Sequence, residues 1–264
     1  MGGTHCASPV PRAGCEAGKG RQYRELAEHR LASALGYVRA VPARAAVIVF
    51  PGTNCEHDVA EALERVGAAP ELVWHTERRL AGFDAAVLPG GFAHGDYLRP
   101  GAIARFSPVM SAIGQLARDG APVVGICNGF QVLTEAHLLP GAFQKNKGLT
   151  FVCQMADLEV ASERSVLTSG LSAGSRLRVP VNHFQGNYIA PPDVLSSLEQ
   201  EGRVVLRYVA NPNGSQRNIA GICNKEGNVV GLMPHPERAS SALLGSTDGL
   251  LLLKALVRSI AAAQ

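Results

Sequence analysis

The chain has 264 residues, of which 46% are hydrophobic and 18% are charged, and its formal net charge is +3. This balance suits one large α/β domain with a substantial core, and it argues against a polyanion as partner. The charge is uneven, because residues 1–44 hold seven basic and three acidic side chains. The rest of the chain is therefore nearly neutral.

The six cysteines form no CxxC pair and no Cys/His cluster with the spacing of metal ligands. A domain of this length needs no disulfide scaffold, so we expect reduced thiols and a cytoplasmic location. Residues 1–44 lack the apolar run of a secretory signal. We expect a disordered N-terminal extension there, with an organelle transit peptide or a start codon assigned too early as alternatives. The domain itself is expected to cover residues 45–264.

Regular structure is predicted to begin at residues 45–50, a continuous apolar run that ends in a Pro-Gly turn. A helix follows, because Thr53 and Glu56 have capping-box spacing and apolar residues recur at helical intervals after them. Gly67 is expected to close this helix. The chain therefore opens with a strand–helix unit.

The remaining elements fall into two groups. In the first half, short apolar strands are predicted at 72–74, 85–88 and 122–126, with a helix at 106–118. In the second half, short alternating segments lie around 153–161, 176–181, 204–209, 219–223 and 229–233, before a helix from 248 to 261. Buried strands between helices indicate a mostly parallel sheet covered on both faces. The second group predicts mixed or antiparallel strands added to that sheet, so the expected fold class is α/β.

The most informative segment is 123–131, where a buried strand runs through Gly-Ile-Cys-Asn-Gly into a helix. This pattern is typical of a nucleophile elbow with Cys127 in place of serine. Gly125 and Gly129 allow the tight turn, and the following helix points its N-terminus at the sulfur, which favours the thiolate. The backbone N–H of Asn128 is then a candidate oxyanion donor. The alternative is that Cys127 is an inert core residue.

A second candidate is the run Pro-His-Pro-Glu-Arg at 234–238, directly after a predicted strand. The two prolines favour an extended backbone, so that His235 and Glu237 project to one side. Glu237 can then bind one ring nitrogen of His235, which leaves the other to take a proton from Cys127. The alternative interpretation is a solvated surface loop.

A third candidate is the glycine-rich loop at 88–96, which also follows a predicted parallel strand. Its free N–H groups predict the second oxyanion donor, at Gly91 or Phe92. An ordinary connection and a phosphate cradle are alternatives, but the loop has neither a GK[ST] nor a GxGxxG pattern. His94 has no second metal ligand at a usable spacing.

Together, Gly-x-Cys-x-Gly-x-Gln at 125–131, His-x-Glu at 235–237 and Pro-Gly-Gly at 89–91 resemble the class I, triad-type glutamine amidotransferases. A closer resemblance is to the glutaminase-subunit family of phosphoribosylformylglycinamidine synthase. It extends from about residue 45 to the C-terminus and is carried by segments 49–55, 91–99, 146–149, 211–215, 231–239 and 245–249. Residues 1–44 have no counterpart in that family, and Gln185 is neutral where the family tends to have an acidic residue.

This resemblance implies that the chain hydrolyses L-glutamine and passes ammonia to a partner synthase in de novo purine biosynthesis. The implied residues are Cys127, His235 and Glu237 as catalytic triad, Gly91, Phe92 and Asn128 as oxyanion hole, and Gln131 and His183 as substrate contacts. The partner would use ATP and Mg to form formylglycinamidine ribonucleotide. No metal or cofactor is expected in this chain, and a small third subunit is left open.

Three alternatives remain at this point. The chain could feed another class I synthase, which makes GMP, anthranilate or carbamoyl phosphate, although the motifs outside the triad argue against it. It could be a stand-alone enzyme of related fold, such as a γ-glutamyl hydrolase or a thiol-dependent stress protein, which would work without a partner. It could also be a non-catalytic module, but Cys127, His235 and Glu237 together argue against that role.

Overall fold

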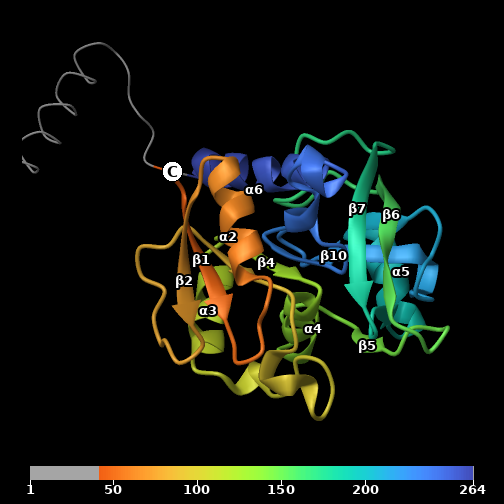
Figure 1. The fold of residues 1–264 in the computed structure, drawn as a ribbon, viewed down its shortest axis with the longest axis horizontal. Helices are drawn as coiled ribbons and strands as arrows, with labels where there is room; N and C mark the ends of the chain where they lie inside the picture. The colour runs from red at the N-terminus through yellow and green to blue at the C-terminus, as the bar shows by residue number, and fades with distance from the viewer. Residues whose placement is uncertain (1–41, 264) are drawn as a thin grey trace, which may run out of the picture. The chain divides into compact units, whose positions relative to one another are not determined.

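The computed structural model describes residues 42–263, and its main feature is a nine-stranded sheet (Figure 1). The strands are β1 (Arg44–Val49), β2 (Ala69–Trp74), β3 (Ala85–Leu88), β4 (Val123–Ile126), β6 (Val152–Val160), β7 (Arg176–His183), β9 (Val204–Tyr208), β10 (Ile219–Cys223) and β11 (Val229–Leu232). Their order is β2-β1-β3-β4-β11-β10-β9-β6-β7. Among these strands only β10 and β6 run against the others.

The sheet has a parallel half and a mixed half, as the sequence predicts. Strands β2, β1, β3, β4 and β11 are all parallel. Strands β10, β9, β6 and β7 are then joined by antiparallel pairs. Every residue of β3, β4 and β11 is buried, so the alternation predicted for 229–233 is wrong: β11 is covered on both faces because it lies inside the parallel half. The expected fold class is confirmed.

Helices cover the two faces of the parallel half. They are α2 (Glu56–Arg65), α3 (Val109–Arg118), α4 (Asn128–Glu135) and α6 (Gly249–Ala263), whereas α5 (Pro192–Gln200) lies beside β6 and β7 of the mixed half (Figure 1). The steps from β1 to β2 and from β3 to β4 go in opposite directions along the sheet, so right-handed crossovers place α2 and α3 on opposite faces. Accordingly α2 packs on β1, β2 and α6, whereas α3 packs on β3 and β4.

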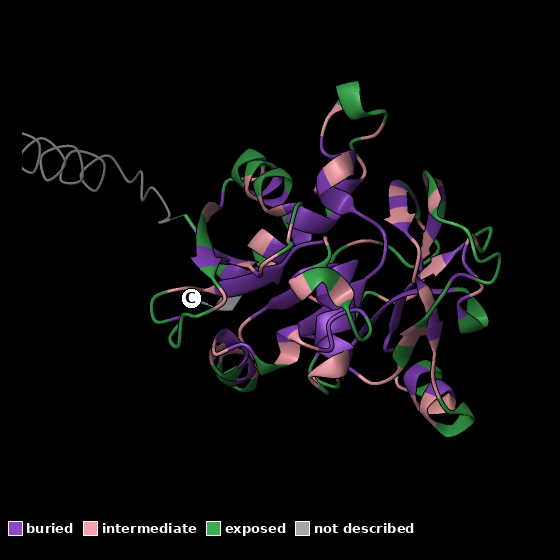
Figure 2. Ribbon diagram, turned by 60° about the horizontal axis from the view of Figure 1, so that its bottom comes forward, coloured by how far each residue is buried: buried purple, intermediate pink, exposed green. Residues whose placement is uncertain are grey.

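Burial follows this arrangement (Figure 2). The strands in the middle of the domain are buried, and exposed residues lie on the outer sides of helices and in loops. No helix within residues 42–263 is both long and apolar enough to cross a membrane.

Several sequence predictions need correction. The helix predicted at 106–118 begins only at Val109, because Ser107 is extended ahead of a proline and Ala104–Phe106 forms a separate 3-10 turn. The predicted capping box is wrong, since the N-cap residue of α2 is Cys55 and has no capping side-chain hydrogen bond. Thr53 Oγ1 instead accepts a hydrogen bond from the N–H of Phe50.

Some short elements and one boundary also differ from the sequence prediction. Helix α5 and the small antiparallel pair β5 (Ala142–Gln144) and β8 (Asn187–Ile189) were not predicted. Most of the predicted extension, residues 1–41, lies outside the described residues. Its last residue, Arg44, already belongs to β1 and pairs with Ala69.

Candidate active site

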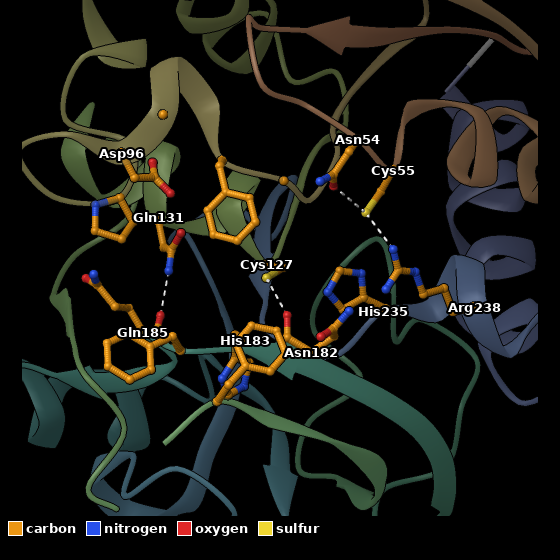
Figure 3. Close-up of a pocket in the computed structure, with 16 residues that line it drawn as sticks. Asn54, Cys55, Asp96, Cys127, Gln131, Asn182, His183, Gln185, His235 and Arg238 are labelled. Carbon is orange, nitrogen blue, oxygen red and sulfur yellow. Dashed lines mark hydrogen bonds between the residues drawn. The ribbon is translucent and has the colours of Figure 1, made fainter. Parts of the chain in front are cut away.

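The candidate catalytic segments meet at one edge of the sheet. Parallel strands present their carboxyl ends at the same edge, so the residues that follow β3, β4 and β11 are neighbours in space. A cavity of about 570 Å³ lies there (Figure 3). Its lining includes Cys55, Gly91, Cys127, His183 and His235. Side chains that are far apart in the sequence thus share one cavity of ligand-binding size.

Cys127 lies in the tight turn between β4 and α4. Its φ is 51° and its ψ is −106°, a strained conformation for a residue other than glycine. The turn is held by the Cys127 N–H, which donates to the Leu232 carbonyl over 2.8 Å. Gly129 permits close packing behind it, because an added Cβ would lie 2.0 Å from the Leu88 carbonyl oxygen. The Cys127 sulfur lies 3.8 Å from the Asn182 carbonyl oxygen.

His235 and Glu237 form a buried hydrogen-bonded pair. His235 Nδ1 lies 2.6 Å from Glu237 Oε1, and both residues are only 2% exposed. The extended backbone predicted for 234–238 is wrong beyond His235, because Pro236–Ala239 forms a 3-10 turn. The predicted side-chain contact is nevertheless present. The backbone N–H of His235 also donates a hydrogen bond of 2.8 Å to the Pro180 carbonyl, which holds the backbone of this segment in place.

This environment favours the protonated ring of His235. Burial alone would lower its pKa, but the charges of Glu237 and Cys127 and hydrogen bonding toward Cys127 and Cys55 raise the pKa well above its usual value. Nε2 has no well-aligned hydrogen-bond partner among the described residues. The site can therefore hold an imidazolium whose Nδ1–H is donated to Glu237 and whose Nε2–H is free.

The β3–α3 loop (residues 89–108) supplies the candidate oxyanion groups. Gly91 has a φ of 147°, and an added Cβ would lie 2.7 Å from the Gly52 carbonyl oxygen. The N–H of Phe92, one of the two predicted donors, is already engaged, since it donates to that same carbonyl over 2.9 Å. In this conformation Gly91 is therefore the better candidate of the two.

Asn128 connects this loop to the elbow. As the first residue of α4, it has a backbone N–H without an intrahelical acceptor, as an oxyanion donor requires. Its side chain accepts a hydrogen bond from the N–H of Ala93 over 2.9 Å and donates to Asp96. The loop and the nucleophile turn are thus held together by one amide side chain.

The two predicted substrate contacts both line the cavity. The Gln131 side chain already has partners: it accepts from Asn128 and donates to the Gln185 carbonyl. His183 is 4% exposed, and burial lowers its pKa to about 4. Its Nε2 lies 3.3 Å from the Asn213 amide nitrogen. Gln131 therefore orders the cavity wall, and His183 is a neutral ring within it.

Comparison with known proteins matches the domain to a family. Residues 42–247 match the CobB/CobQ-like glutamine amidotransferase domain. A protein from Rubrobacter xylanophilus, named phosphoribosylformylglycinamidine synthase subunit PurQ, is 56% identical over 214 residues, which cover 81% of this chain and 97% of the relative. The PurQ subunit of Mycolicibacterium paratuberculosis is 54% identical over 221 residues, covering 83% and 99%. This chain belongs to the PurQ family.

Solved structures agree with membership of the PurQ family. A chain in the structure of PurLQS from Thermotoga maritima superposes with a TM-score of 0.78 at 40% identity, covering 83% of this chain and 100% of that one. A glutamine amidotransferase from the same organism gives a TM-score of 0.52 at 19% identity, covering 84% and 98%, and shows the fold alone.

Two cavity residues of this PurQ-family chain were not singled out from the sequence. Cys55 and Arg238 both line the cavity, and Arg238 Nη2 donates to the Cys55 sulfur over 3.1 Å. Both lie inside the segments that carry the family resemblance, so the motif contained them. Only the approach of α2 to the turn after β11 brings them together.

Proposed function

We propose that this chain hydrolyses L-glutamine with Cys127 as nucleophile, His235 as acid and base, and Glu237 as the group that orients His235. Membership of the PurQ family makes the chain the glutamine amidotransferase subunit of phosphoribosylformylglycinamidine synthase. The observation that carries the residue roles is the elbow of Cys127 in one cavity with the buried His235–Glu237 pair. A thiol nucleophile must be reduced, which fits the cytoplasmic location that we propose.

In the first half of the reaction, the Cys127 thiolate attacks the side-chain amide carbon of glutamine. The carbonyl oxygen then becomes an oxyanion, which the backbone N–H groups of Gly91 and Asn128 stabilise. His235 donates its proton to the departing nitrogen, so ammonia leaves and a thioester remains on Cys127. The raised pKa of His235 supports this order, because the ring is charged before the substrate arrives.

In the second half, His235 is neutral and takes a proton from a water molecule. The hydroxide attacks the thioester, passes through a second oxyanion and releases glutamate. Glu237 stabilises the imidazolium through Nδ1 in each half without transferring a proton itself. These steps need no metal or organic cofactor in this chain.

The ammonia is delivered to a partner synthase that makes formylglycinamidine ribonucleotide in purine biosynthesis. A complex named PurLQS from Thermotoga maritima contains a chain similar to this one, which supports assembly with a synthase subunit and a small third subunit. We propose that ATP and Mg are used by the synthase.

The test is a coupled assay with the candidate synthase subunits, ATP, Mg and formylglycinamide ribonucleotide. Glutamine should support formation of the amidine only when this chain is present. The synthases for GMP, anthranilate and carbamoyl phosphate are controls, and the proposal is wrong if glutamine-derived ammonia reaches one of them instead. Full glutaminase activity without any partner would indicate a stand-alone hydrolase.

A further inference from the structure

A second thiol lies in the same cavity as Cys127, and the proposed hydrolysis does not use it. Cys55 precedes α2 and is 2% exposed. Arg238 donates a hydrogen bond to its sulfur, as Figure 3 shows. Cysteine binds metal ions as the thiolate, so metal binding at Cys55 would release the thiol proton to water.

The sulfur of Cys55 is packed against the His235–Glu237 pair. An added Cβ on Gly90 would lie 2.7 Å from His235 Cε1 and 3.2 Å from the Cys55 sulfur, so the two side chains meet over this glycine. One potential ligand atom from each of Cys55, His235 and Glu237 lies within 4.8 Å of the other two. Oε2 of Glu237 is a buried acceptor without a hydrogen-bond partner among the described residues.

We propose that Cys55, His235 and Glu237 bind a Zn²⁺ ion, and that this binding inhibits the glutaminase. Thiolate, imidazole and carboxylate are all zinc ligands, with bonds of about 2.3 Å to sulfur and about 2.0 Å to nitrogen and oxygen. His235 Nδ1 and Glu237 Oε1 are already 2.6 Å apart across one proton. The ion takes the place of that proton, which is released to water, and the two atoms separate slightly while the Cys55 side chain moves inward.

Zinc at this position stops the chemistry without touching Cys127. A ring that binds the ion through Nδ1 keeps its proton on Nε2, so it cannot accept a proton from the thiol or from water. Glu237 is then a metal ligand and no longer stabilises the imidazolium. The inhibition rests on the proposed function, whereas the binding of zinc does not.

The experiment measures zinc affinity of the full chain by competition with a chromophoric chelator. Cys55→Ser should weaken the affinity by more than about tenfold, as loss of a ligand requires. Glu237→Gln should also weaken the affinity by more than about tenfold, although it leaves Cys55 intact. Agreement between these two variants indicates the loss of a ligand instead of misfolding. Cys127→Ser and the exposed Cys153→Ser are matched controls that should keep wild-type affinity. Zinc that binds elsewhere on the chain contributes equally to every variant, so it does not affect the differences in affinity among them.

Cobalt provides a second readout, because a thiolate ligand gives Co²⁺ a sulfur-to-metal absorption band. The band should disappear in Cys55→Ser and persist in Cys127→Ser. Wild-type affinity in Cys55→Ser, or an equal loss in Cys127→Ser, would overturn the ligand set. In the assembled complex, saturating zinc should abolish glutamine hydrolysis, and unchanged hydrolysis would refute inhibition. Zinc binding in a chain that never hydrolyses glutamine would instead refute only the proposed function.

Discussion

Two regions at the same edge of the sheet differ sharply in how they are held. Cys127, His235 and Glu237 are at most 6% exposed, and they follow directly from buried parallel strands or the turn after one. In the β3–α3 loop beside them, Tyr97 is 86% exposed and Leu98 is 77% exposed. This loop is held to α4 by the Asn128 amide and by the ion pair of Arg99 with Glu135.

On the proposed function, this difference separates the groups that make and break bonds from the groups that control access to the cavity and stabilise the oxyanion. Strand ends cannot move without disturbing the core, so we expect Cys127, His235 and Glu237 to keep the same arrangement with and without a partner. The loop carries exposed apolar side chains at the cavity mouth, as interaction surfaces do. It also has positive φ values at His94 and Asp96, which mark a strained conformation. We expect variants of the first region to remove chemistry and perturbations of the second to tune it.

The largest effect is expected from the buried region. Cys127→Ala should abolish glutamine hydrolysis, because the thiol is the only covalent centre proposed. Ammonium salts should still support synthesis in the assembled complex, since the synthase site lies on another chain. The measurement is glutamate release alongside amidine formation from glutamine and from ammonium. Glutaminase turnover near wild type would show that Cys127 is not the nucleophile.

His235→Ala should be nearly as damaging, because base and nucleophile act as a unit and their losses do not add. Glu237→Gln keeps the shape but not the charge and should cost about tenfold to a thousandfold in kcat. Steady-state kinetics in the complex compares the two variants. If Glu237→Gln were more impaired than His235→Ala, the assignment of roles would be reversed.

The effect of the β3–α3 loop should appear as an increase in glutaminase activity when the partner synthase binds. Gly91, one of the two proposed oxyanion donors, lies in this loop, and a peptide beside a glycine can flip away from the cavity at little cost in the isolated chain. One missing oxyanion donor costs about 3–4 kcal/mol, so kcat/KM for glutamine should rise by about 100-fold to 1000-fold in the substrate-bound complex. Equal kcat/KM values for the isolated chain and the complex would remove the distinction between the two regions.

A third effect concerns stability and comes from the mixed half of the sheet. The pKa of His183 is about 4 in the folded chain, mainly through burial, against about 6.5 unfolded. The unfolded chain therefore binds more protons between these values, so this contribution is full above pH 6.5 and is lost as the pH falls to 4. It amounts to about 3 kcal/mol.

His183→Gln removes this titration and keeps an acceptor for Asn213. The free energy of unfolding should then fall less between pH 7 and pH 4.5 than it does in the wild type. Urea unfolding at both pH values measures the difference, and His57→Gln, which changes an exposed histidine, is the control. Parallel pH dependence in His183→Gln and the wild type would contradict the buried neutral ring.

The smallest effect is expected from removing residues 1–41, which leaves β1 whole from Arg44. These residues lack hydrophobic periodicity, so melting temperature and glutaminase activity should change little. The competing hypothesis is that residues 23–38 form a helix that docks on the domain or a partner. A melting temperature several degrees lower, or failure to join the complex, would support docking.

The sequence by itself determined the strands, turns and residue pairs that a short stretch of neighbouring residues encodes. Apolar runs predicted β1, β3 and β4, and the Gly-x-Cys-x-Gly spacing predicted the strained turn at Cys127. The pair His235 and Glu237 was also predicted, because two residues apart in one segment cannot separate far. The segments that resemble the family then pointed to the same reaction as the relatives found by comparison.

The tertiary structure decided everything that depends on which segments meet. The turn at Pro236–Ala239 replaces the expected extended backbone, since α6 packs against it and only Gly249 leaves room for Pro236. The N–H of Phe92 is engaged because the loop after β1 passes beside the loop after β3. Cys55 reaches His235 because α2 approaches the turn after β11. Such contacts join residues far apart in the chain, and no local pattern encodes them, because they follow from strand order and close packing.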